Sequence, residues 1–295
     1  MSNPVSSPPY RKRVLTMRGV SKHFGAVKAL TDVDFWVNEG EVVALIGDNG
    51  AGKSTLVKIL AGVHPPDGGT IEFDDEAVEI ASPADSQALG IETIFQDLAL
   101  CDNLDVVANL WLGRELVTSG GLDEVEMEQR TWTLLRELSA KVPSVRIPVA
   151  ALSGGQRQTV AIARSLIGEP RVVILDEPTA ALGVAQTAEV LNLIERLRER
   201  GHGVILISHN MADVLAVADR VVVLRLGRNN GVFSAVDATS ETLVAAITGA
   251  TQGGGSAPEP PAAPRGESGA PIIPMPSKSA RRGSARTSRD NRNDA

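Results

Sequence analysis

The chain has 295 residues, of which 43% are hydrophobic and 22% charged, and its formal net charge is −7 at pH 7. This composition is typical of a soluble globular protein, and the negative charge argues against nucleic acid as the main partner. The single cysteine excludes an internal disulfide, and the sequence lacks both a membrane-spanning apolar run and a signal peptide, so we expect a cytosolic protein.

The N-terminal part of the chain shows the pattern of antiparallel strands. Residues 1–12 are rich in Pro and Ser, and we expect them to be flexible. The runs "VLTMRGVSKHFG", "DVDFWV" and "GTIEFDDEAVEI" then place short apolar segments between turn residues. This pattern predicts an antiparallel β subdomain at the start of a globular region that covers residues 13–250.

A glycine-rich loop, "GDNGAGKST" at residues 47–55, follows an apolar run and precedes the helical pattern "STLVKILAG". It matches G-x-x-x-x-G-K-[ST], in which glycines let backbone N–H groups surround phosphate oxygens. Lys53 adds positive charge at the β- and γ-phosphates, and the Ser54 hydroxyl is a ligand for Mg²⁺. This strand–loop–helix context disfavours a chance glycine turn and predicts a nucleoside triphosphate site.

The middle of the chain predicts a helical lobe. Residues 97–152 are rich in helical pattern and interrupt an otherwise alternating α/β series. Gln96, in "ETIFQD", ends a strand just before this lobe; its amide is either a Mg²⁺ or water ligand or an ordinary surface group. At the end of the lobe, "LSGGQRQ" places a serine and two glycines at a predicted helix start, which is a second anion site.

The C-terminal half predicts a parallel sheet. The runs at residues 41–47, 171–177, 203–209 and 220–227 are almost continuously apolar, as in strands buried on both faces. Between two of them, four apolar residues recur at helical spacing, and Gly201 follows the helix. These four are Val190, Leu193, Ile194 and Leu197.

Polar residues follow two of these strands. Asp176 can hold Mg²⁺ through water, and Glu177 can polarise an attacking water, although an acid in this position also caps helices. His209 ends another strand; a lone histidine is more often structural, but ligands bind at the carboxyl ends of parallel strands. We expect Asn210 and Asp213 to cap the next helix.

The last segment, residues 251–295, changes to Gly, Ala, Pro, Ser and Arg. Such a composition cannot bury enough apolar surface to fold alone, so we expect a disordered, solvated tail. A weak contact with acidic lipid headgroups is the alternative.

Together, these motifs resemble the nucleotide-binding subunit of ATP-binding cassette (ABC) transporters over residues 14–249. In order, they correspond to the Walker A loop at 47–55, the Q-loop "FQD", the signature "LSGGQ", the Walker B strand "VVILDE" and the switch histidine after Ser208. The resemblance implies the α/β P-loop NTPase fold of ABC ATPases, with an antiparallel β subdomain and an inserted helical subdomain at about residues 97–155.

The resemblance also implies roles for individual residues. Glu177 polarises the water, His209 contacts the γ-phosphate, and Gln96 senses Mg²⁺ and couples to a membrane partner. Phe24 stacks on adenine; without the resemblance it would be interpreted as a core residue. The implied Mg²⁺ ligands are Ser54, Gln96 and Asp176. The implied ATP contacts are Gly47, Asp48, Asn49, Gly50, Ala51, Gly52, Lys53, Ser54 and Thr55 and, from the facing protomer, Ser153, Gly154, Gly155 and Gln156.

At one motif the chain differs from the usual family sequence, and this difference indicates a particular group within the family. After "DEPT" the family usually has Ser-Ala-Leu-Asp, whereas this chain has Ala180–Gly183, so communication between the two sites of a dimer is in doubt. The variant "TAALGVAQT" occurs in the ATPases of monosaccharide importers, which "GVHPPDGGTI", "IFQDLAL" and "NLWLGRE" also resemble. We therefore expect a homodimeric ATPase that uses ATP and Mg²⁺ at the cytoplasmic face of the membrane. Its partners would be permease subunits and, indirectly, a sugar-binding protein, with no nucleic acid.

Three alternatives remain. One is an ABC ATPase for another solute. A soluble cassette protein that acts on ribosomes or DNA usually has a larger insertion than the stretch between Gln96 and Ser153 allows. A regulatory cassette without hydrolysis would lack Lys53, Glu177 or His209, and all three are present.

Overall fold

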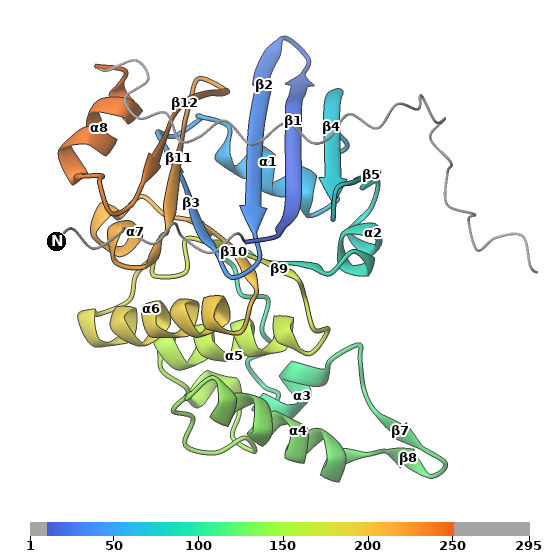
Figure 1. Ribbon diagram of the computed structural model, residues 1–295. Helices are drawn as coiled ribbons and strands as arrows, with labels where there is room; N and C mark the ends of the chain where they lie inside the picture. The colour runs from blue at the N-terminus through green and yellow to red at the C-terminus, as the bar shows by residue number, and fades with distance from the viewer. Residues whose placement is uncertain (1–10, 251–295) are drawn as a thin grey trace, which may run out of the picture. The chain divides into compact units, whose positions relative to one another are not determined.

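The computed structural model describes residues 11–250, in which the predicted fold class is confirmed. Figure 1 shows an antiparallel sheet, a mainly parallel sheet and a helical lobe. Residues 1–10 and the tail at 251–295 lie outside the described residues, and our expectations for them therefore stay predictions.

The antiparallel sheet has the strand order β2-β1-β4-β5. Buried and more exposed residues alternate along β2, as expected for a sheet with one face on the core, and Leu15, Met17 and Phe35 are fully buried. The strands are β1 (Arg13–Phe24), β2 (Val27–Asn38), β4 (Gly68–Phe73) and β5 (Glu76–Val78).

The second sheet has the order β12-β11-β3-β10-β9-β6, and the five strands from β11 to β6 are parallel. The four predicted apolar runs form strands in it. The antiparallel edge strand β12 was not predicted, because its half-exposed residues have no apolar run. The strands are β3 (Val42–Gly47), β6 (Ile91–Ile94), β9 (Val172–Asp176), β10 (Gly203–Ile207), β11 (Arg220–Arg225) and β12 (Arg228–Ser234).

Five helices accompany the two sheets. In α6 the buried residues are the four predicted from helical spacing, and Gly201 beyond its end has the left-handed φ of 90°. The helices are α1 (Lys53–Leu60), α2 (Pro83–Ala88), α6 (Val184–Glu199), α7 (Met211–Val217) and α8 (Ser240–Thr248).

The helical lobe is inserted between β6 and β9 (Figure 1). Inside it, the Trp111 indole N–H donates to the Thr131 hydroxyl at 3.0 Å and ties two of its helices together. A small exposed hairpin in the lobe was not predicted. The elements are α3 (Val106–Trp111), β7 (Val117–Thr118), β8 (Gly121–Leu122), α4 (Glu124–Glu137), the 3₁₀ turn Val149–Ala151 and α5 (Gly154–Leu166).

Two large hydrophobic cores lie on opposite faces of the parallel sheet. One contains residues of the lobe and of α5 and α6, and the other contains residues of α1 and the antiparallel sheet. Successive residues of β9 and β10 alternate between them; Val173 belongs to the first core and Ile174 to the second. The two glycine-rich motifs therefore begin helices that pack in different cores.

A buried ion pair joins β11 to the start of β3. The Arg220 guanidinium donates to Glu41 at 2.8 Å, and both side chains are at most 10% exposed. Arg220 also donates to the Trp36 carbonyl at 2.8 Å and lies over the Trp36 ring. Since Glu41 also accepts the Asn38 N–H, this cluster connects three strands.

We expect Arg220→Ala to lower the free energy of unfolding by about 3 kcal/mol, because it leaves the Glu41 carboxylate buried without its partner. Urea denaturation measures this change. The control is Arg130→Ala, which breaks an exposed pair with Glu126 and should cost less than about 0.5 kcal/mol. Equal losses in the two variants would contradict the role of burial.

Candidate functional site

The glycine-rich loop after β3 is held where side chains do not fit. Gly47 has φ 156°, and a Cβ there would lie 2.3 Å from the Leu224 carbonyl oxygen. Gly52 has φ 105°, and its Cβ would lie 2.6 Å from Leu30 and 2.7 Å from the Ala29 carbonyl oxygen. Both positions therefore require glycine for conformation and for space.

Positive charge gathers at this loop. The Lys53 ammonium donates to the carbonyl oxygens of Gly47 at 2.7 Å and Asp48 at 3.1 Å, which keeps it against the loop. Helix α1 starts here with no side-chain cap, and Ser54 in its first turn is exposed. Uncapped backbone N–H groups, the positive end of the helix and a lysine together favour a bound phosphate.

Asp176 ends strand β9 and lies opposite Ile207 of β10. Burial raises the pKa of its carboxyl group, and the neighbouring Glu177 charge raises it further. The Lys53 charge acts in the opposite direction, so the lysine of the loop and this carboxylate share one electrostatic environment. The site thus holds a half-buried carboxylate that a nearby cation stabilises.

Glu177 turns its backbone sharply after the strand, with φ 52°. Its N–H donates to the Ile207 carbonyl at 2.9 Å, which holds this left-handed conformation. The Glu177 carboxylate then lies 2.8 Å from His209 Nδ1, although the two residues follow different strands. The pair requires a proton on Nδ1, so Nε2 of the exposed imidazole is available to another group.

Only half of the predicted cap of α7 is correct. Asn210 accepts the Ala212 N–H at 3.0 Å, as predicted. The prediction for Asp213 is wrong, because this carboxylate is buried and accepts the Thr179 hydroxyl at 2.7 Å. The Thr179–Asp213 bond ties the loop after Glu177 to α7, and sequence reasoning missed it because the two residues are far apart in the chain.

Gln96 is exposed two residues after β6, and within residues 11–250 its side chain has no hydrogen bond. Its neighbours Phe95 and Asp97 line a cavity of about 340 Å³ between this loop and the lobe. Arg114 and Arg164 also line this cavity. Gln96 itself is not among the residues that line this cavity.

The second glycine motif starts helix α5 with a capping box. The Ser153 hydroxyl accepts the Gln156 N–H at 3.3 Å, and the Gln156 side chain accepts the Ser153 N–H at 3.0 Å. Gly154 is exposed, whereas a Cβ on buried Gly155 would lie 3.0 Å from Gln186 of α6. The first turn of α5 thus offers free N–H groups beside a close helix contact.

The structure brings the two carboxylates, Lys53 and His209 together but leaves the α5 motif elsewhere. Helix α1 packs on β2 and β3, whereas α5 packs on α3, α6 and β6. Figure 1 shows α1 beside the antiparallel sheet and α5 beside the lobe. The chain therefore carries two glycine-rich helix starts that are separate in space.

Phe24, at the end of β1, is 43% exposed, so its interpretation as a core residue is wrong. Its ring makes an edge contact with His64 at 5.2 Å between centroids, and the Lys22 ammonium lies 5.7 Å from the ring centroid. Lys22 also donates to Asp67, and this bond chiefly lowers the pKa of Asp67 to about 2. An exposed, laterally supported ring is suited to stacking.

The comparisons with known proteins agree with this geometry. A family model described as "ABC transporter" matches residues 30–180. A xylose/arabinose import ATP-binding protein of Sulfolobus acidocaldarius is 46% identical over 73% of this chain and 86% of its own. A fructose import ATP-binding protein of Rhizobium meliloti is 43% identical over 81% and 95%. A solved ATP-binding cassette of an ABC transporter, in its ADP conformation, has a TM-score of 0.69 at 25% identity over 80% and 95%.

The raised pKa of Asp176 leads to a prediction about stability. In the interval between its ordinary and its raised pKa, the folded state binds more protons than the unfolded state, so stability falls as pH rises through that interval. Above it, the ionised carboxylate remains a cost to folding. We expect Asp176→Asn to raise Tm by about 2 °C at pH 7 without nucleotide or metal, and to weaken the pH dependence of Tm.

Thermal unfolding by circular dichroism between pH 4 and 8 measures both effects. Asp48→Asn, which removes an exposed carboxylate of the loop, is the matched control and should leave Tm nearly unchanged. A lower Tm for Asp176→Asn than for the unchanged chain at pH 7 would disprove the explanation.

Proposed function

This chain belongs to the ABC transporter family and is an ABC-type ATPase, and we propose that it is the ATP-hydrolysing subunit of a monosaccharide importer. The observation that carries the proposal is the gathering of Lys53, Asp176, Glu177 and His209 around neighbouring parallel strands. The carboxyl ends of parallel strands are where such folds bind ligands.

In this proposal, the N–H groups of residues 47–55 surround the phosphates of ATP, and Lys53 exchanges its loop carbonyls for the β- and γ-phosphates. Phe24 stacks on adenine. Its exposure and its support by His64 and Lys22 favour this role over one in the core.

The donor set fits Mg²⁺, which prefers oxygen ligands and usually combines one or two carboxylates with substrate phosphates. Ser54 supplies a hydroxyl, Gln96 an amide oxygen and Asp176 a carboxylate. Within residues 11–250 no three His, Cys, Asp or Glu side chains are arranged to hold a metal by themselves, so the phosphates of ATP would complete the set. The ion would neutralise charge on the β- and γ-phosphates.

For hydrolysis, we assign the Glu177 carboxylate to accept a hydrogen bond from the attacking water. The water oxygen bonds to the γ-phosphorus while the bond to the bridging oxygen breaks, which gives ADP and phosphate and releases a proton. The bond to Glu177 holds His209 at the site, and with the imidazole protonated on both nitrogens its Nε2 would donate to the γ-phosphate.

The α5 motif would complete the site of a second copy. Gly154 and Gly155 present free N–H groups, between the capped Ser153 and Gln156, at a helix start that packs in a different core from α1. One chain would bind ATP at α1, and its α5 motif would contact the ATP of a second copy. In such a homodimer each ATP contacts both chains, and both ATP sites are complete. Asp48, Asn49, Gly50, Ala51 and Thr55 would act with the remaining loop residues on the Walker A side.

We place the permease at the cavity beside Gln96. Its walls come from the loop after β6 and from the lobe, and Phe95 and Leu112 expose apolar surface there. No helix within residues 11–250 combines the length and the apolar content of a bilayer-spanning segment. The chain would therefore bind at the cytoplasmic face of the membrane through permease subunits, and a sugar-binding protein would deliver the solute to them.

The monosaccharide is the most specific part of the proposal. It rests on the xylose/arabinose and fructose importers named among the relatives. In the organism that encodes this chain, deletion of its gene should abolish uptake of labelled xylose, arabinose or fructose. The native gene should restore uptake, and the Glu177→Gln gene should not. Unchanged uptake of all three sugars would favour another solute.

We expect Glu177→Gln to keep nucleotide binding and to lower ATP turnover about 10²–10⁴-fold, since one positioned acid–base group is lost. Phosphate release and binding of a fluorescent ATP analogue measure the two properties. Glu199→Gln removes an exposed carboxylate at the end of α6 and is the matched control. Near-normal hydrolysis by Glu177→Gln would contradict the role of this carboxylate.

We expect Gly154→Asp to abolish hydrolysis without weakening ATP binding to the monomer. Its side chain would meet Leu182, already 3.0 Å from an ideal Cβ, and its charge would repel phosphate at the helix start. The rate per chain of the unchanged protein should rise with protein concentration. A rate per chain that stays constant while sizing shows monomers would mean that one chain hydrolyses ATP alone.

A further inference from the structure

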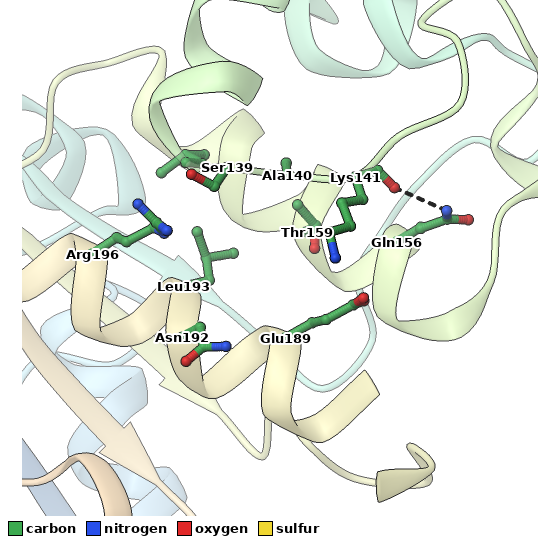
Figure 2. Close-up of a pocket in the computed structure, with 10 residues that line it drawn as sticks. Ser139, Ala140, Lys141, Gln156, Thr159, Glu189, Asn192, Leu193 and Arg196 are labelled. Atoms are coloured by element: carbon green, nitrogen blue, oxygen red, sulfur yellow. Dashed lines mark hydrogen bonds between the residues drawn. The ribbon is translucent and has the colours of Figure 1, made fainter. Parts of the chain in front are cut away.

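A second cavity, of about 230 Å³, lies between the helical lobe and α6 (Figure 2). The turn after α4, the first turns of α5 and the outer face of α6 form its walls. It is distinct from the cavity beside Gln96, since the two have no lining residue in common.

The cavity has an apolar floor and a polar rim. Leu138 and Leu193 are each 3% exposed and form part of the floor. In the part of the chain that the structure describes, the rim side chains form no hydrogen bond or ion pair with other residues. These side chains are Ser139, Lys141, Glu189, Asn192 and Arg196.

The charged side chains next to the cavity, in contrast, form ion pairs. Arg200, directly after α6, donates to Glu137 of α4 at 2.6 Å and so joins α4 to the end of α6. At the start of α5, Arg157 pairs with Asp102. Arg200 and Arg157 thus pair with carboxylates, whereas Lys141 and Arg196 line the cavity without forming an ion pair to Glu189, the carboxylate of the same wall (Figure 2).

The order of the polar groups indicates the ligand. Arg196 and Glu189 lie seven residues apart on one face of α6, about 10 Å along its axis. Arg196 presents a planar fork of donors that matches a phosphate or carboxylate. Glu189 and Asn192, further along, can accept hydrogen bonds from hydroxyl groups. Two cations against one carboxylate leave the wall net positive.

We propose that this cavity binds a small polyol that carries one phosphate or carboxylate group, of the sugar-phosphate or sugar-acid class. The anionic group contacts Arg196, the hydroxyl groups contact Asn192, Glu189 and Ser139, and the Lys141 ammonium donates to a ligand oxygen at the Glu189 end (Figure 2). The volume is below the range of drug-sized pockets, which suits a monosaccharide derivative.

This ligand would also act on the signature motif. The Gln156 amide donates to the Lys141 carbonyl at 3.0 Å, shown dashed in Figure 2, while its oxygen holds the Ser153 N–H. A ligand that contacts the Lys141 side chain shifts the backbone of Lys141 and with it the carbonyl that orients Gln156. Binding in the cavity is then coupled to the nucleotide contact of the α5 helix start, and the coupling is reciprocal.

Isothermal titration of the full chain tests the site, with ADP saturating the phosphate loop so that anions cannot bind there. Glucose 6-phosphate or gluconate should bind with a Kd of about 1 mM or tighter, and glucose and inorganic phosphate at least about ten-fold more weakly. Which of the two anions binds more tightly distinguishes a phosphate from a carboxylate ligand.

The variants locate the binding. Arg196→Gln and Lys141→Gln should each weaken it at least about ten-fold, whereas Arg136→Gln, an exposed charge of α4 outside the cavity, should not. The better ligand should also shift the KM for ATP in the unchanged chain and not in Arg196→Gln. No binding of either anion, equal binding of inorganic phosphate, unchanged binding by Arg196→Gln, or an unmoved KM would overturn the proposal. The titration does not depend on hydrolysis, so failure of the proposed ATPase role would be recognised separately.

Discussion

The structure depends on close backbone contacts between β2, the phosphate loop and the β11–β12 turn. The Gly227 N–H donates to the Ala51 carbonyl at 3.1 Å, and the Thr31 N–H donates to the Gly227 carbonyl at 2.8 Å. A Cβ on Gly52 or Gly227 would lie 2.7 Å from the Ala29 carbonyl oxygen. These contacts join β2, the phosphate loop and the β11–β12 turn, so the position of Lys53 follows from both sheets at once.

The candidate site contains a half-buried charge and a strained backbone conformation, both of which are unfavourable for folding. Residues of β9 before Asp176 are fully buried and apolar, but the strand ends in a half-buried carboxylate whose pKa burial raises. Glu177 follows in a left-handed conformation that a non-glycine residue rarely adopts. Strain and unfavourable charge of this kind persist where the surrounding hydrogen bonds determine the conformation, here at the mouth of the sheet.

The two glycine-rich helix starts belong to different hydrophobic cores. The phosphate loop leads into the core around α1, and the α5 motif leads into the core of the lobe. This division explains why the two helix starts of one chain do not meet. It also places a seam between the lobe and α6, which the Arg200–Glu137 bond crosses.

The sequence by itself determined the phosphate loop, the apolar strands, the α6 core face and the order of the motifs, because glycine requirements and hydrophobic periodicity are local. Only the tertiary structure decided the exposure of Phe24, the Thr179 partner of Asp213, the Glu177–His209 contact and the cavity beside Arg196. Each of these joins residues that are distant in the chain or depends on which face of an element another element covers. Such relations are set by packing between elements, and no local pattern encodes them.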